Sequence, residues 1–134
     1  MREKPPFSNG NFRIDKIRAY LLKKEENTRA SKQKEQREII AKLRNLSQIW
    51  EKYCIDKVYL HGSISDLSFN RNSDIDLAIE PDVGFEALLK LYQEINKYFK
   101  REVDIRVLND LLFIDKVKSR GILIYVRKDS NIKK

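Results

Sequence analysis

Two short motifs decide the fold of this chain, VYLHGS at residues 58–63 and SDIDLAI at residues 73–79. Each contains a run of apolar, β-prone residues, so each predicts a strand. The first strand ends at Gly62, which lacks a Cβ and therefore permits backbone angles and close approaches that other residues forbid. A Gly-Ser pair between a strand and a short helix can present N–H groups and a hydroxyl to an anion, usually a phosphate.

The second motif places two carboxylates on one face of its strand. Side chains alternate along a strand, so Asp74 and Asp76 share one face, and Ile75, Leu77 and Ile79 share the other. Two neighbouring carboxylates repel each other and resist burial. A divalent cation would relieve this repulsion, and hard oxygen ligands suit Mg²⁺. The motif therefore predicts a candidate magnesium site.

The composition indicates a globular domain of the cytoplasm. The chain has 134 residues, of which 41% are hydrophobic and 36% are charged, and this is enough for a core of its own. No run approaches the ~20 apolar residues of a membrane helix, and we expect no signal peptide because the first residues lack an apolar region. The single cysteine, Cys54, excludes an internal disulfide and fits a reducing compartment.

Positive charge is concentrated in the N-terminal part of the chain. The net charge is +8; residues 1–53 carry 14 Lys and Arg against 7 Asp and Glu, whereas residues 54–134 carry 14 against 13. Such an excess indicates an anionic partner surface or nucleic acid, and a solvated helix face explains it equally well. Direct binding of nucleic acid is compatible with this charge but is not the interpretation that we favour.

The rest of the pattern alternates helices and strands. Apolar spacing predicts a helix over residues 12–21, and residues 23–38, which have no large apolar side chain, form either an exposed helix or a charged linker. One apolar stripe predicts a helix over residues 39–53. The elements expected after the second motif are a helix over 85–99, a strand over 103–108, a helix over 111–117 with Asn109 or Asp110 as its cap and Gly121 at its end, and a strand over 122–126.

Gly62-Ser63, ten intervening residues and Asp74-Ile75-Asp76 together resemble the signature of the DNA polymerase beta-type nucleotidyltransferases. The resemblance is closest to the minimal nucleotidyltransferases, which are often paired with a HEPN-domain partner in toxin–antitoxin systems. It covers roughly residues 35–134. It implies an α/β (α+β) fold with a small mixed sheet flanked by helices. Residues 1–34 would then be a basic, helical N-terminal extension, through which the chain could self-associate.

The same resemblance implies three acidic site residues. Asp74 and Asp76 would hold the Mg²⁺ ion bound to the triphosphate, and these two with Asp104 would hold a second Mg²⁺ ion. Strand parity independently selects Asp104, because the apolar residues of the 103–107 segment would point to the core and Asp104 the other way. Asp104 could also accept the proton of the nucleophile. The alternative for Asp104 is an exposed acid on an edge strand.

Nucleotide-binding residues are expected around the first motif. Gly62 and Ser63 would cradle the β- and γ-phosphates of ATP, and Arg71 would either reach a phosphate or remain a surface cation. Arg106 shares the predicted face of Asp104, where it would contact the nucleotide or a partner, or else form an ion pair with one of the acids. His61 is best explained as a histidine at a strand end with a structural hydrogen bond, because the chain has no second histidine for a metal site.

One stretch departs from the family pattern. Many members have Arg residues and a Gly directly after the Gly-Ser pair, whereas residues 64–67 here read ISDL. The missing cations argue against tight triphosphate binding, and Asp66 would repel phosphates slightly. This departure leaves room for a protein that keeps the fold and the acids but works slowly or acts by binding alone.

The function implied by the resemblance is Mg²⁺-dependent transfer of AMP from ATP to a protein hydroxyl. The expected acceptor is a tyrosine of a HEPN-type toxin, which would make the chain an antitoxin. One alternative is transfer to a small molecule such as an aminoglycoside, although such enzymes usually carry a second domain that holds the substrate. The other alternative is an antitoxin that acts by occlusion alone.

Overall fold

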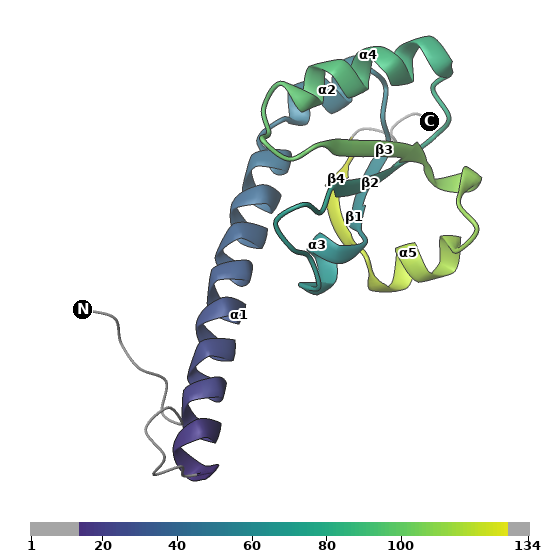
Figure 1. The fold of residues 1–134 in the computed structure, drawn as a ribbon. Helices are drawn as coiled ribbons and strands as arrows, with labels where there is room; N and C mark the ends of the chain where they lie inside the picture. Colours follow the sequence, from purple (N-terminus) through teal and green to yellow (C-terminus); the bar gives the residue numbers. More distant parts are fainter. Residues whose placement is uncertain (1–13, 129–134) are drawn as a thin grey trace. The chain divides into compact units, whose positions relative to one another are not determined.

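A computed structural model of the protein describes residues 14–128 (Figure 1). The chain divides into two compact units, Met1–Glu35 and Gln36–Lys134. The expected helix over residues 12–21 falls partly outside the described residues. The helices and strands of the described residues are, in chain order, α1 (Ile14–Arg44), α2 (Ser47–Lys52), β1 (Lys57–His61), α3 (Ser63–Asp66), β2 (Ile75–Glu80), α4 (Phe85–Asn96), β3 (Val103–Val107), the 3-10 helix η1 (Leu108–Asp110), α5 (Ile114–Arg120) and β4 (Ile122–Val126).

Four strands form one mixed sheet in the order β3-β2-β1-β4. β1 pairs antiparallel with both β2 and β4, and β2 pairs parallel with β3. The parallel pair requires a crossover connection, which α4 supplies. The expected small mixed sheet with flanking helices is confirmed.

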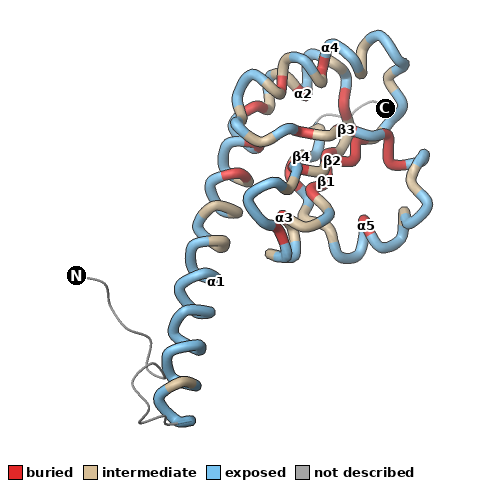
Figure 2. Tube along the Cα trace, viewed as in Figure 1, coloured by how far each residue is buried: buried red, intermediate tan, exposed pale blue. Residues whose placement is uncertain are grey.

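One face of the sheet carries the larger hydrophobic core, whose residues are among the buried ones drawn in red in Figure 2. The end of α1, with α2 and α4, covers this face, and Trp50 and Leu43 are fully buried there. The core residues of these helices and of the strands facing them include Ile39, Leu43, Trp50, Val58, Leu60, Ile75, Leu77, Leu91, Ile95, Val103 and Ile105.

The apolar stripe over residues 39–53 is buried as expected, but it lies on two helices. α1 ends at Arg44 and α2 begins at Ser47, with a turn between them. The carbonyl of Leu43 accepts hydrogen bonds from the Leu46 N–H at 3.2 Å and from the Trp50 indole N–H at 3.1 Å. The indole therefore adds a second hydrogen bond to a carbonyl at the end of α1, where the regular helical donors run out.

Residues 23–38 form an exposed helix, which excludes the charged linker. They lie within α1, which is continuous from Ile14 to Arg44. The segment contains neither Gly nor Pro and is rich in Lys, Glu, Gln and Arg, which all favour helix. Among residues 14–128, no helix is both long and apolar enough to cross a membrane.

The opposite face of the sheet is covered by α5. Val117 of α5 is buried with Tyr59 of β1, Ala78 of β2 and Leu108 of η1 in a second, smaller cluster. This contact places one side of α5 against the middle of β1 and β2, the strands that carry the two sequence motifs.

One expectation about α5 was wrong, and another is confirmed. Residues 108–110 form a 3-10 helix, so neither Asn109 nor Asp110 caps α5, which begins at Ile114 without a side-chain cap. Gly121 ends α5 as expected, although its φ of −71° is a backbone angle that any residue can adopt. Glycine is needed there for its size, because a Cβ would lie 2.5 Å from the Val117 carbonyl oxygen and 3.1 Å from that of Leu60.

Candidate active site

The candidate site begins at the turn that follows β1. Gly62 has φ 77° and ψ −156°, a conformation essentially restricted to glycine. A Cβ added to Gly62 would lie 2.3 Å from Oδ2 of Asp76. The carboxylate of the second motif therefore lies directly against the backbone of the first, and only glycine permits both the conformation and the contact.

The short helix α3 follows this turn, as the sequence predicts. The N–H groups of Ser65 and Asp66 donate to the Gly62 carbonyl at 3.1 and 3.3 Å. Gln36 ties α3 to the end of α1, because its side-chain amide donates to the carbonyls of Ile64 and Ser65 at 2.9 and 3.0 Å. These contacts fix the turn from two sides.

Strand pairing aligns three polar residues in one row across the sheet. Asp76 pairs with His61 of β1 on one side and with Asp104 of β3 on the other. All three side chains are half-buried, and the apolar residues that alternate with the two acids are buried in the opposite core. Asp74 precedes β2 and is exposed, so it adjoins this row without being part of it.

The electrostatics of the row oppose negative charge on Asp76. Burial raises the pKa of the Asp76 carboxyl, and the neighbouring charges of Asp104 and Asp74 raise it further. Burial also lowers the pKa of His61, which therefore remains neutral at pH 7. The three acids predicted from the sequence thus interact electrostatically in the folded chain.

Arg106 forms an ion pair with Asp104, with its Nε 3.1 Å from Oδ2 of the carboxylate. This is the structural alternative considered for Arg106. Within the part of the chain that the structure describes, no group of three or more His, Cys, Asp or Glu side chains is arranged to hold a metal ion. The donor set nevertheless suits Mg²⁺ chemically, because it consists of carboxylates whose repulsion a divalent cation would neutralise.

The predicted nucleotide-binding residues lie in different surroundings. Gly62 lines a cavity next to Asp76, and Ser63 begins α3 and is half-buried. Arg71 is exposed in the loop before β2 and does not line that cavity. Arg101 holds this loop, because its Nη1 donates to the carbonyls of Asn70, Arg71 and Ser73 at 2.9, 3.3 and 2.7 Å. The sequence analysis missed this role of Arg101, and no local pattern indicates it.

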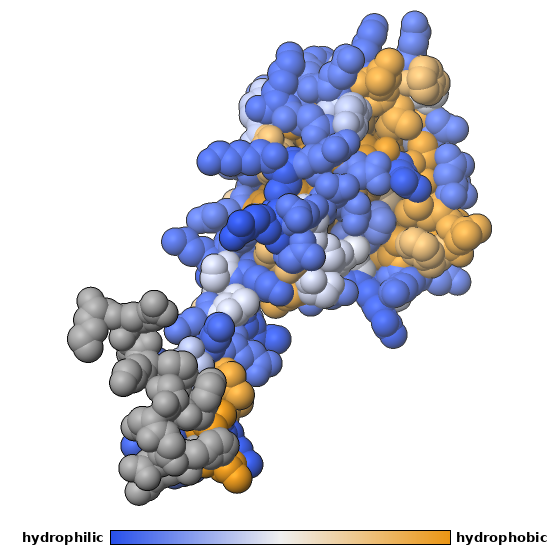
Figure 3. All heavy atoms as spheres, viewed as in Figure 1, coloured by the Kyte–Doolittle hydropathy of each residue, from blue (hydrophilic) through white to orange (hydrophobic). Residues whose placement is uncertain are grey.

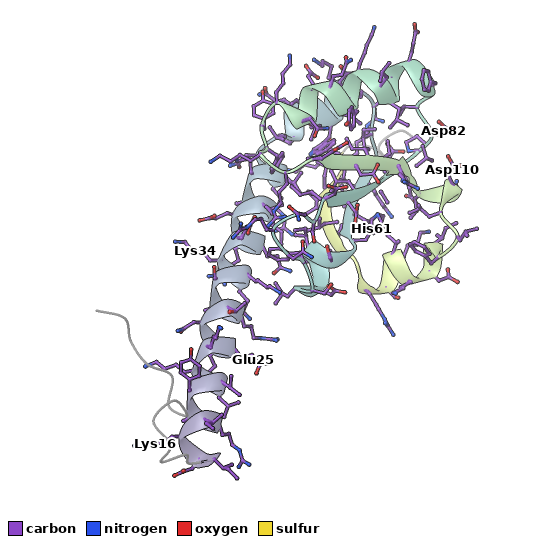
Figure 4. The ribbon with its side chains drawn as sticks, viewed as in Figure 1. Lys16, Glu25, Lys34, His61, Asp82 and Asp110 are labelled. Atoms are coloured by element: carbon purple, nitrogen blue, oxygen red, sulfur yellow. The ribbon has the colours of Figure 1, made fainter. Side chains whose placement is uncertain are left out.

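A cavity of about 480 Å³ lies between α5 and the part of this row formed by His61 and Asp76; Asp104 does not line it. His61, Gly62 and Asp76 line it from the sheet, and Figure 4 shows His61 on the side of the sheet that faces α5. Its other wall is the α5 segment, which contributes Phe113, Lys116 and Arg120 among others. The sequence analysis did not select these three residues, although their i, i+3, i+7 spacing puts them on one helix face.

Comparison with known proteins agrees with this fold. The family model described as "Polymerase beta, Nucleotidyltransferase" matches residues 44–130. A chain from a crystal structure of a toxin–antitoxin with AMP-PNP is similar, with a TM-score of 0.52 and 22% identity over 64% of this chain and 75% of that one. A chain from the toxin–antitoxin MntA-HpeT, mutated at two aspartates, has a TM-score of 0.52 and 19% identity over 65% and 75%. No curated protein is similar enough to count as a match.

Proposed function

Because this chain belongs to the polymerase beta nucleotidyltransferase family, we propose that it transfers AMP from ATP to a hydroxyl group of a protein. The observation that carries the proposal is the row formed by Asp76 and Asp104 beside the turn at Gly62. In this reaction the acceptor oxygen forms a bond to the α-phosphorus, the bond between the α-phosphorus and the bridging oxygen breaks, and pyrophosphate leaves.

The acids take the roles that the family resemblance implies. Asp74 and Asp76, with Asp104, would hold Mg²⁺, which supplies charge neutralisation for the phosphates and the leaving group. Asp104 would accept the proton that the acceptor hydroxyl loses. Gly62 would bring its backbone close to the phosphates, because it has no Cβ to exclude them.

A protein acceptor is supported by two observations. Structural neighbours of this chain come from toxin–antitoxin complexes. In addition, the described surface of the second unit exposes large apolar side chains, including Leu112 at 99% and Phe85 at 78% of their area. Figure 3 shows hydrophobic residues gathered at one side of this unit, a feature typical of protein contact sites. The acceptor we propose is a tyrosine of a HEPN-type toxin.

The decisive experiment uses the full chain purified with its co-expressed toxin partner, Mg²⁺, and ATP labelled at either the α- or the γ-phosphate. We expect the α-label on the partner, no γ-label, and a mass increase of one AMP. The Asp76→Asn chain serves as the control for contaminating transferases.

Each other outcome identifies a competing function. The γ-label on the partner would indicate a kinase, and a stable unlabelled complex would indicate neutralisation by binding alone. Neutralisation by binding alone is favoured by residues 64–67, which lack the Arg residues that many family members have there. Label that appears on an added aminoglycoside rather than on the partner would indicate a small-molecule transferase.

A further inference from the structure

The triphosphate of a nucleotide carries several negative charges, and a binding site normally meets them with cations. The stretch directly after Gly62-Ser63 offers none, since residues 64–67 read ISDL. The cations nearest to this turn must therefore come from another element. The cavity beside Gly62 shows which one, because its far wall is formed by α5.

α5 presents a basic face to the cavity. Its buried residue Val117 packs against Tyr59 and Ala78 of the sheet, which fixes the rotation of the helix about its axis. With that rotation, Lys116 and Arg120 line the cavity together with Gly62 and Asp76.

The third cation of α5, Lys118, does not line the cavity. Its Nζ lies 3.7 Å from Oε2 of Glu80, at the other end of β2. The two cavity cations are one helical turn apart, roughly 6 Å at 1.5 Å per residue, so a chain of linked phosphates could contact both.

Asp66, the acid in residues 64–67, lines the same cavity and offsets only part of this basic face. The Asp66 carboxylate accepts hydrogen bonds from the Ser68 N–H at 3.0 Å and from the Ser68 hydroxyl at 2.6 Å. These bonds lower the pKa of Asp66, and the charge of Lys116 lowers it further. Asp66 therefore stays ionised, held by Ser68 of its own turn, and its charge partly opposes that of Lys116. The other acid of the cavity, Asp76, is the residue assigned to the metal.

We propose that Lys116 and Arg120 of α5 bind the β- and γ-phosphates of the nucleotide, replacing the cations that are missing after Gly62-Ser63. The inference rests on the proposed function and assigns the polyphosphate part of its substrate to this wall of the cavity. Arg120 can offer a planar pair of N–H donors to one phosphate, and Lys116 a mobile point charge to the next.

Equilibrium binding of ATP, ADP and AMP to the full chain in Mg²⁺ tests the assignment. The native protein should prefer ATP over AMP. Lys116→Ala and Arg120→Ala should each weaken ATP binding by roughly 10-fold or more, the usual loss for a hydrogen bond to a charged group, and leave AMP binding nearly unchanged. Inorganic triphosphate should compete with ATP in the native protein and compete poorly in both variants.

The matched control is Lys118→Ala, which removes the same charge from the same helix but outside the cavity. It should keep the native preference for ATP, and Arg120→Lys should recover part of the affinity lost in Arg120→Ala. All three substituted side chains are exposed, so a thermal melt should show folded variants.

The outcomes separate this inference from the proposed function. The assignment is overturned if Lys116→Ala and Arg120→Ala bind ATP as the native chain does, or if Lys118→Ala loses as much affinity as they do. Native protein that binds no ATP would overturn it as well. If the ATP preference depends on Lys116 and Arg120 but no label reaches a partner, the assignment holds and the transferase function fails.

Discussion

Asp76 occupies a position in which its surroundings oppose its charge. Burial, Asp104 and Asp74 all raise the pKa of its carboxyl, and only Arg106 acts in the opposite direction. A folded-state pKa above the unfolded value stabilises the fold at acidic pH, and this contribution is lost as the pH rises through the folded-state pKa. At neutral pH and without metal, the ionised Asp76 therefore destabilises the protein.

The first prediction is that Asp76→Asn stabilises the metal-free protein at pH 7 and abolishes transfer. The substitution removes a half-buried charge, so the melting temperature should rise, and this gain should vanish below about pH 4, where the native carboxyl is neutral as well. Transfer should fall on the order of 100-fold or more, the scale expected for a group that acts on the reacting atoms.

Thermal melts against pH, with and without Mg²⁺, check this prediction. Mg²⁺ should stabilise the native chain more than the variant, and Asp110→Asn, which changes an exposed acid, should show little effect. A variant that melts lower than the native chain, or one that keeps full transfer, would argue against a metal site at Asp76.

The second prediction compares two glycines with similar backbone conformations. Gly62 has φ 77° and Gly84 has φ 92°, so alanine should strain either position by about 1–3 kcal/mol. An added Cβ meets nothing within 4 Å at Gly84, whereas at Gly62 it would lie 2.3 Å from Asp76 Oδ2. We therefore expect both variants to lose stability in chemical denaturation, and only Gly62→Ala to lose Mg²⁺-dependent ATP binding.

Gly84→Ala is the control for backbone strain in this pair. Equal ATP binding by the two variants would mean that the contact between Gly62 and the Asp76 carboxylate has no part in the site. Loss of binding in Gly84→Ala alone would place the nucleotide near the start of α4 instead.

At the scale of elements, alternation predicted the strands but could not predict their pairing. The apolar residues of β2 and β3 lie in the core because side chains in a strand alternate, which is why the face of Asp104 could be inferred from the sequence. That Asp76 pairs with both His61 and Asp104 depends on strand order and register, and these follow from contacts distant in sequence.

The residues that the sequence analysis missed act between elements. Arg101 holds the loop before β2 through three carbonyls, and Asn96 at the end of α4 exchanges hydrogen bonds with both backbone groups of Val103. Lys116 and Arg120 matter because Val117 fixes the rotation of α5 on the sheet. None of these roles follows from local spacing, since each is defined by a partner in another element.

At the scale of the whole molecule, the core residues that the structure describes all belong to the second unit. The first of them along the chain is Ile39, and Gln36 of the same unit donates a hydrogen bond to α3. The first unit instead exposes apolar side chains on α1, with Ile14 at 67%, Leu21 at 55% and Leu22 at 53% of their area. An isolated helix with so short an apolar stripe is marginal in water, so we expect these side chains to contact another molecule.

The third prediction is that the N-terminal extension of residues 1–34, the N-terminal arm, mediates self-association. Deleting residues 1–30 should leave ATP binding and the melting of the domain intact and should lower the oligomeric mass in analytical ultracentrifugation. Because the arm is basic, salt should screen the repulsion between copies and strengthen the association of the native chain. Leu21→Glu in the full chain should have the same effect as the deletion, since it places a charge within the apolar stripe while leaving the arm present.

An oligomeric mass unaffected by either change would exclude self-association through the arm. If instead the deletion lowers affinity for the toxin, and if salt weakens the binding of the native chain to the toxin, the arm contacts an acidic surface of the toxin.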